Sequence, residues 1–285
     1  MKKLQNKIYI VLFAAFLTAV LAACARENGT PETAPALTQE ITPEQEPAPP
    51  TQVITETPVY ITIRGEQFST SLTVLSLDGA LTNEDIVPLR YMTELTELTV
   101  GVMDPSNQIT DLSPIAGLTN LSGLFFNGNY IADLSPLSGL ENLTNVSFFL
   151  NQIYDISPLA GLSNLWILQL GASQISDITP LAELTNLISL DLSWNQISDL
   201  TPLSGLTNLH TLILRDNQIT DVTPLSGLAY SGRSNLTNLE LHNNQISDIT
   251  PLAGLVSLES LWLNGNPITD FSAVRHVDNI IFEMQ

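Results

Sequence analysis

Apolar residues recur in the same order along most of the chain, and the order returns every 22 residues. In the copy that begins at Leu184, apolar residues fall at Leu187, Leu190, Leu192 and Ile197. The isoleucine position recurs at Ile109, Ile131, Ile153, Ile175, Ile197, Ile219, Ile246 and Ile268. With a more divergent first copy, the pattern predicts about nine repeats over residues 75–271, interrupted by an insertion at residues 229–233.

Each repeat contains the signals of a short strand, a turn and a helical turn. Alternation around Leu190 and Leu192 predicts a strand with Ser189, Asp191 and Ser193 facing outward. Asn195 then predicts a bend at which the side-chain amide bonds backbone groups. The same residue type recurs at Asn129, Asn151, Asn195, Asn217, Asn244 and Asn266, whereas Ser173 interrupts the column and predicts a weaker link.

The dipeptide Thr201-Pro202 marks the start of the helical turn, with the threonine hydroxyl expected as its N-cap. Few residues remain before the next strand, which favours a 3₁₀ or one-turn helix over a longer one. One copy is too small to fold alone, so stability must come from stacking. The predicted fold class is an α/β solenoid, with a parallel β-sheet on its concave face and short helices on its convex face.

The pattern LxxLxLxxNxIxDLxPLxxL over residues 72–271 resembles the leucine-rich repeats of bacterial internalin-like surface proteins. The resemblance implies a leucine-rich repeat horseshoe used for recognition at a cell surface. The sequence differs from sortase-anchored internalins because it contains no LPxTG-type motif.

Residues 1–23 have the layout of an export signal, with three lysines followed by an apolar run. The run ends in Leu21-Ala22-Ala23-Cys24, which resembles the lipobox of bacterial lipoproteins and implies that Cys24 carries the lipid. We therefore expect an exported protein that is lipid-anchored to the bacterial cell membrane and faces outward. An ordinary secretory signal and an uncleaved anchor helix are the alternatives.

The composition changes on either side of the repeats. Residues 24–57 are rich in Pro, Thr and Glu with few large apolar side chains, which predicts a disordered tether. Residues 58–74 alternate in the manner of a hairpin and are expected to form an N-terminal β cap. Residues 272–285 are expected to form the C-terminal cap.

The net negative charge of the chain excludes some classes of binding partner. The formal net charge is −20, and all three lysines lie within residues 1–7. Nucleic acid requires a basic face, so no nucleic-acid partner is expected. An anionic membrane would repel this chain, so the lipid on Cys24 is expected to be its sole membrane contact. We expect a monomer with no cofactor.

The variable outward positions of the strands are the candidate binding residues, because they differ from repeat to repeat while the scaffold does not. Trp166 and Trp194 flank them and are expected to be partly in the core. Scattered surface residues without a binding role are the alternative. The candidates for contacting a protein partner are the apolar Phe125, Phe149, Ile213 and Trp262 and the polar Asp191, Arg215, Glu240 and His242.

An acidic column accompanies the repeats and raises the question of calcium. A carboxylate can instead accept bonds from backbone amides at the turn, which is the favoured interpretation, and no metal site is expected. The column contains Asp111, Asp133, Asp155, Asp177, Asp199, Asp221, Asp248 and Asp270.

Catalysis finds little support in the sequence. The three histidines lack metal-ligand spacing, and Ser193, His242 and Asp191 span two repeat intervals, too far for a triad. The main hypothesis is therefore a non-enzymatic recognition module that binds a protein through its concave face. A glycan- or peptidoglycan-binding lipoprotein and an envelope structural protein are the alternatives.

Overall fold

The computed structural model describes residues 58–101, 106–230 and 233–281, which belong to one compact unit, residues 57–285. The signal, the lipidation residue Cys24 and the tether fall outside the described residues. Strands β1 (Tyr60–Ile63) and β2 (Glu66–Ser69) form the predicted antiparallel hairpin. Ile61 and Ile63 of this hairpin are buried in the common core.

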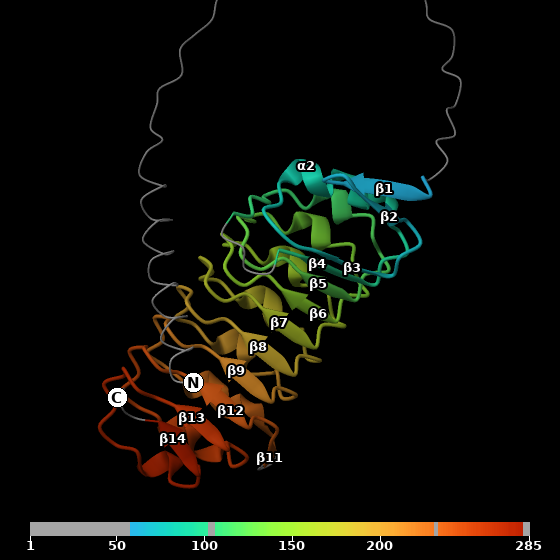
Figure 1. The fold of residues 1–285 in the computed structure, drawn as a ribbon. Helices are drawn as coiled ribbons and strands as arrows, with labels where there is room; N and C mark the ends of the chain where they lie inside the picture. The colour runs from blue at the N-terminus through green and yellow to red at the C-terminus, as the bar shows by residue number, and fades with distance from the viewer. Residues whose placement is uncertain (1–57, 102–105, 231–232, 282–285) are drawn as a thin grey trace, which may run out of the picture. The chain divides into compact units, whose positions relative to one another are not determined.

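A parallel sheet runs through all the repeats, as the sequence predicts, and Figure 1 shows its strands stacked in chain order. In the described part of the chain the sheet has ten strands. They are β3 (Val74–Leu77), β4 (Glu97–Val100), β5 (Gly123–Phe125), β6 (Asn145–Ser147), β7 (Ile167–Gln169), β8 (Ser189–Asp191), β9 (Thr211–Ile213), β12 (Asn238–Glu240), β13 (Ser260–Trp262) and β14 (Asn279–Ile281).

Short helical turns connect successive strands. The first connection contains α2 (Asn83–Ile86) and η1 (Val87–Tyr91), and the insertion contributes the two-residue strands β10 (Ala229–Tyr230) and β11 (Arg233–Ser234). The remaining turns are 3₁₀ helices: η2 (Ser113–Ile115), η3 (Ser135–Leu137), η4 (Ser157–Leu159), η5 (Thr179–Leu181), η6 (Thr201–Leu203), η7 (Thr223–Leu228), η8 (Thr250–Gly254) and η9 (Ser272–Val274). This arrangement confirms the solenoid of the predicted class.

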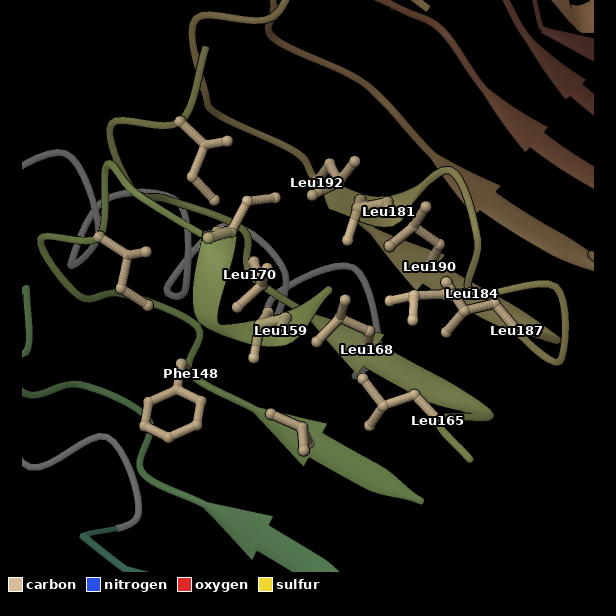
Figure 2. Close-up of a cluster of buried hydrophobic side chains, with 14 of the residues drawn as sticks. Phe148, Leu159, Leu165, Leu168, Leu170, Leu181, Leu184, Leu187, Leu190 and Leu192 are labelled. Atoms are coloured by element: carbon tan, nitrogen blue, oxygen red, sulfur yellow. The ribbon is translucent and has the colours of Figure 1, made fainter. Parts of the chain in front are cut away.

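The repeated leucines form one continuous core between the strands and the turns. Leu168, Leu170, Leu190 and Leu192 are fully buried, and Figure 2 shows such side chains gathered from successive repeats. Phe126 and Phe148 take the place of leucines in two repeats, and their rings stack with centroids 5.9 Å apart.

The asparagine column forms the expected ladder. The Oδ1 atom of Asn195 accepts a bond from the amide of Ile175 (2.9 Å), and its Nδ2 donates to the carbonyls of Leu170 and Leu192 (both 3.1 Å). Five of the six asparagines tie their repeat to the preceding one in this way, at Asn151, Asn195, Asn217, Asn244 and Asn266. Asn129 is the exception: its Oδ1 is buried without a partner, and within the described residues its Nδ2 donates only to its own repeat. At the interruption the Oγ of Ser173 is buried without a partner, which confirms the weaker link.

The aspartate column caps the 3₁₀ turns, and this corrects the expectation for the threonine. In η6 the N-cap position is Leu200, so Thr201 is the first residue of the turn and not its cap. The Oδ1 of Asp199, two residues earlier, instead accepts the amide of Thr201 at 2.8 Å. The same bond recurs at 2.8 Å from Asp111 to Asp270, which confirms the backbone-bonding interpretation of the column.

Candidate functional site

The register of the sheet places outward residues of different repeats side by side. Asp191 of β8 pairs with Ile213 of β9, which pairs with Glu240 of β12, which pairs with Trp262 of β13. Four of the eight candidate residues are therefore adjacent in one row across the sheet, and Phe125 lies further along the same row. We call the outward side of the ten-stranded sheet, together with the residues that follow each strand, the sheet face.

The chain adopts a left-handed conformation three residues after most strands. Glycine accepts this conformation freely, whereas a residue with a Cβ atom pays about 1 to 2 kcal/mol. Leu150 (φ 60°) and Trp194 (φ 51°) are bulky residues at such positions. The column contains Gly128, Leu150, Ala172, Trp194, Asp216, Asn243 and Gly265.

Phe149 lies across the neighbouring repeat because Gly171 leaves room for its ring. A Cβ atom on Gly171 would come within 2.8 Å of both the Phe149 ring and the Ser193 hydroxyl. The Phe149 ring meets Trp194 edge to face, with centroids 6.1 Å apart. Rings in this arrangement attract each other beyond the area that they bury.

Arg215 contacts both the aromatic ring of Trp194 and the carboxylate of Glu240. Its guanidinium carbon lies 3.9 Å from the centroid of the Trp194 ring, a cation–π arrangement. Its Nε lies 3.7 Å from Glu240 Oε2, which is an ion pair but too long for a hydrogen bond. Phe149, Trp194, Arg215 and Glu240 thus form one chain of contacts that spans five successive repeats, from β6 to β12, with Gly171 in the repeat of β7.

The polar members are half-buried, and burial alters their ionisation. Burial raises the pKa of Glu240; Arg215 opposes this rise and Asp191 adds to it. Burial also lowers the pKa of His242; Arg215 lowers it further and Asp216 opposes this, and the net shift favours the neutral imidazole. The His242 ring contacts Trp262 with centroids 5.8 Å apart.

The structure therefore joins seven of the eight candidates through direct pairing in the sheet or side-chain contact. Phe125 lies in the same row of the sheet, but Ser147 and Gln169 separate it from Asp191, and its ring lies against Gly123. Trp194 and Gly171 were not among the candidates. The sequence offered two signals for them. Trp194 is a large aromatic residue in a column that holds several small or polar residues, and Gly171 occupies the position of Phe149 in the next repeat.

Two expectations about single residues are wrong. Ser193 does not face solvent: it is fully buried, and its Oγ donates to Asp191 Oδ1 at 2.6 Å. Trp166 is not part of the core, because 54% of its surface is exposed. It lies at the opposite end of the strands, beside Ile167 and Ile188, which are 38% and 41% exposed. Trp194 is half-buried, as expected.

Within the described ranges, no group of three or more His, Cys, Asp or Glu side chains is placed to hold a metal ion. Ser193 and Asp191 are hydrogen-bonded, but His242 follows β12, two strands away from β8. The described helices are also all too short and too polar to cross a membrane.

Comparison with known proteins places this geometry in a class. Residues 185–227 and 234–276 match a family described as Leucine Rich repeats (2 copies), so the chain is a leucine-rich repeat protein. Internalin C2 of Listeria monocytogenes is 39% identical, with a TM-score of 0.62 over 70% of this chain and 86% of that one. Internalin InlF of the same organism is 30% identical, with a TM-score of 0.60 over 77% and 72%. The chain belongs to the internalin-type leucine-rich repeat family.

A more distant likeness shows the fold alone. The ectodomain of the plant receptor kinase GASSHO1/SCHENGEN3 of Arabidopsis thaliana, solved with CASPARIAN STRIP INTEGRITY FACTOR 2, is 18% identical. Its TM-score is 0.60, over 75% of this chain and 30% of that one. The comparison with curated proteins finds no match.

The family carries a general function. Leucine-rich repeat proteins, including internalins and receptor ectodomains, typically mediate protein–protein interaction, and the fold is typically a non-enzymatic scaffold. Internalin-like proteins are typically surface or secreted proteins.

Proposed function

We propose that this protein is a non-enzymatic, cell-surface recognition module that binds a protein partner through its sheet face. The observation that carries the proposal is the contact chain of Phe149, Trp194, Arg215 and Glu240. Aromatic and arginine side chains dominate the energy of protein interfaces, and here they are held by one another. Trp194 also occupies a backbone conformation that favours glycine, and such strained positions are frequent at binding sites.

An affinity capture with paired variants tests this proposal. The chain, its Phe149→Ala/Trp194→Ala variant and its Trp166→Ala variant are incubated with envelope and host-cell extracts, and retained proteins are identified by mass spectrometry. We expect a partner that the parent and Trp166→Ala retain and the double variant loses. A partner retained equally by all three would place the interface away from the sheet face.

We further propose that Cys24 carries a lipid that anchors the protein to the outer side of a bacterial membrane. The supporting observation is the sequence Leu21-Ala22-Ala23-Cys24 after an apolar run. Labelling with an alkyne fatty acid in a bacterial host should mark the parent and not Cys24→Ser. Equal labelling of both, or none in the parent, would contradict the assignment.

A further inference from the structure

The middle of the sheet face places an apolar side chain between two carboxylates. Ile213 is in register with Asp191 on one side and Glu240 on the other. Neighbouring strands are about 4.8 Å apart, so the two acidic residues are separated by about 10 Å across Ile213. Ile213 is half-exposed and forms the floor of this row.

Neither carboxylate is fully neutralised by the chain. Asp191 Oδ1 accepts bonds from the Ser193 amide (2.9 Å) and hydroxyl (2.6 Å), which orient the group but carry no positive charge. Glu240 has Arg215 as its ion-pair partner at 3.7 Å, and that guanidinium is committed to the Trp194 ring. Glu240 is thus half-buried with a single cation nearby, at a distance too long for a hydrogen bond.

Charged residues near the row of Asp191, Ile213 and Glu240 add to its negative charge. Asp216 follows Arg215 and accepts a bond from Asn243, so this part of the sheet face has three carboxylates, Asp191, Asp216 and Glu240, against one guanidinium. The chain has no lysine after Lys7 that could supply a further cation. With a formal net charge of −20, long-range attraction also favours a basic partner.

We propose that the protein partner seats a basic side chain, lysine or arginine, over Ile213 between Asp191 and Glu240. Such side chains have an apolar stem, which packs on Ile213, and a cationic head, which reaches the carboxylates. An acidic partner residue aimed at Arg215 would instead meet Glu240 and the charge of the whole chain. This inference rests on the proposed function and specifies the chemistry of its partner.

A lysine introduced at position 213 can imitate the partner's basic side chain, so the proposal can be tested in the full chain without a partner. Ile213→Lys places an ammonium between the carboxylates, and Ile213→Met is a control of similar length without charge. At low salt we expect the lysine variant to melt about 2 to 4 °C above the methionine variant. The difference should shrink in 1 M salt and vanish in an Asp191→Asn/Glu240→Gln background.

A lysine variant that melts no higher than the methionine variant would overturn the proposal, as would an equal difference in the neutralised background. Asparagine at position 191 retains an oxygen for the Ser193 bonds, so this background separates charge from structure.

A pair of peptide probes tests the preference for a basic ligand directly. Acetyl-Phe-Lys-Phe-amide and its norleucine counterpart differ in one ammonium group, and the indole NMR signals of Trp194, Trp262 and Trp166 report where each binds. We expect the lysine probe to bind roughly fivefold tighter and to move Trp194 or Trp262 rather than Trp166. Equal affinities, or no shift at Trp194 and Trp262, would overturn the proposal.

Failure of this inference is distinguishable from failure of the proposed function. If Phe149→Ala/Trp194→Ala abolishes partner capture and Asp191→Asn/Glu240→Gln leaves it unchanged, the partner binds here without a basic residue between the carboxylates. If neither variant alters capture, the sheet face is not the interface.

Discussion

The asparagine column and the left-handed column occupy adjacent positions in the repeat and behave in opposite ways. Asn195 is buried, and its hydrogen bonds recur in most other repeats. Trp194, one residue earlier, is half-exposed, and its contacts with Phe149 and Arg215 occur once in the described chain. One column holds the solenoid together, and the other presents a different side chain in each repeat.

The difference shows that adjacent residues of one repeat can serve separate roles, one in folding and one in binding. Bonds repeated along the array stabilise the stack whatever the neighbouring side chain is. The contacts of the sheet face depend on particular pairs, such as Phe149 with Gly171. Substitutions in the two columns should therefore affect different measurements.

The largest effect is expected from the asparagine column. Asn195→Ala leaves the Ile175 amide and two buried carbonyls without their partner, so we expect a loss of about 3 kcal/mol or more in the free energy of unfolding. Urea denaturation measures it. Ser173→Ala is the control and should change stability by less than about 0.5 kcal/mol. Similar losses in the two variants would contradict the role given to the ladder.

A gain of stability is expected from completing the ladder. The amide of Ile153 has no hydrogen-bond partner within the described residues, and Ser173 is where the missing asparagine would lie. Ser173→Asn should raise the free energy of unfolding by about 1 to 2 kcal/mol. A denaturation midpoint equal to that of the parent would show that the position cannot accept the amide.

A smaller loss is expected where the sheet face needs a glycine. Gly171→Ala forces the Phe149 ring to move and should cost about 1 kcal/mol, with a change in Trp194 fluorescence. Gly161→Ala is the matched control, because nothing lies within 4 Å of its added Cβ atom. Equal stability of the two variants and an unchanged emission spectrum would contradict the close packing of Phe149.

Trp194→Asn should change the free energy of unfolding only slightly, because two effects oppose each other. Asparagine tolerates the left-handed conformation better, whereas the half-buried indole contributes apolar contact. We expect a net change within about 1 kcal/mol together with a loss of partner capture. A loss above 2 kcal/mol would make Trp194 a structural residue.

The aspartate column makes folding stability depend on pH, through a small contribution from each of several aspartates. Hydrogen bonds from Thr179, Thr201, Thr223, Thr250 and Ser272 lower the pKa values of Asp177, Asp199, Asp221, Asp248 and Asp270.

These aspartates bind protons more weakly in the folded state than in the unfolded state. Their stabilisation is therefore complete above the ordinary pKa of about 3.9 and disappears as the pH falls through the lowered values. Glu240, with a raised pKa, opposes this loss, whereas His242, with a lowered pKa, adds a loss of stability that begins as the pH falls below about 6.5. Urea midpoints at pH 7, 5, 3.5 and 2.5 should therefore fall most steeply below about pH 4, and less steeply there in Asp177→Asn/Asp199→Asn. A flat profile would contradict the capping role.

The fold could be predicted because its determinants are periodic. Leu190 and Leu192 alternate in one repeat as their equivalents do in the others, so each copy confirms the assignment of the rest. The interruption at Ser173 was visible for the same reason. The helix cap was assigned to Thr201 instead of Asp199 because a 3₁₀ turn that begins at the threonine leaves its hydroxyl outside the capping position.

The binding surface could be predicted only in outline. Outward positions such as Asp191 and Glu240 follow from strand alternation. The exposure of Trp166 and the burial of Ser193 depend on how large side chains cover their neighbours across repeats. The role of Trp194 requires the backbone angle and the distance to Arg215, and neither has a sequence signature.

The missing side-chain hydrogen bond at Ser173 also affects how the chain resists a pulling force. Most successive repeats are joined by an asparagine that bonds the previous copy, whereas no such bond joins the repeat of Phe148 to the repeat of Leu170. Between the repeat of Asn151 and the repeat of Asn266, a stretched chain should therefore part first at this joint, leaving two shorter stacks. Single-molecule pulling of the parent and of Ser173→Asn would then show an early extension step in the first that moves to higher force in the second.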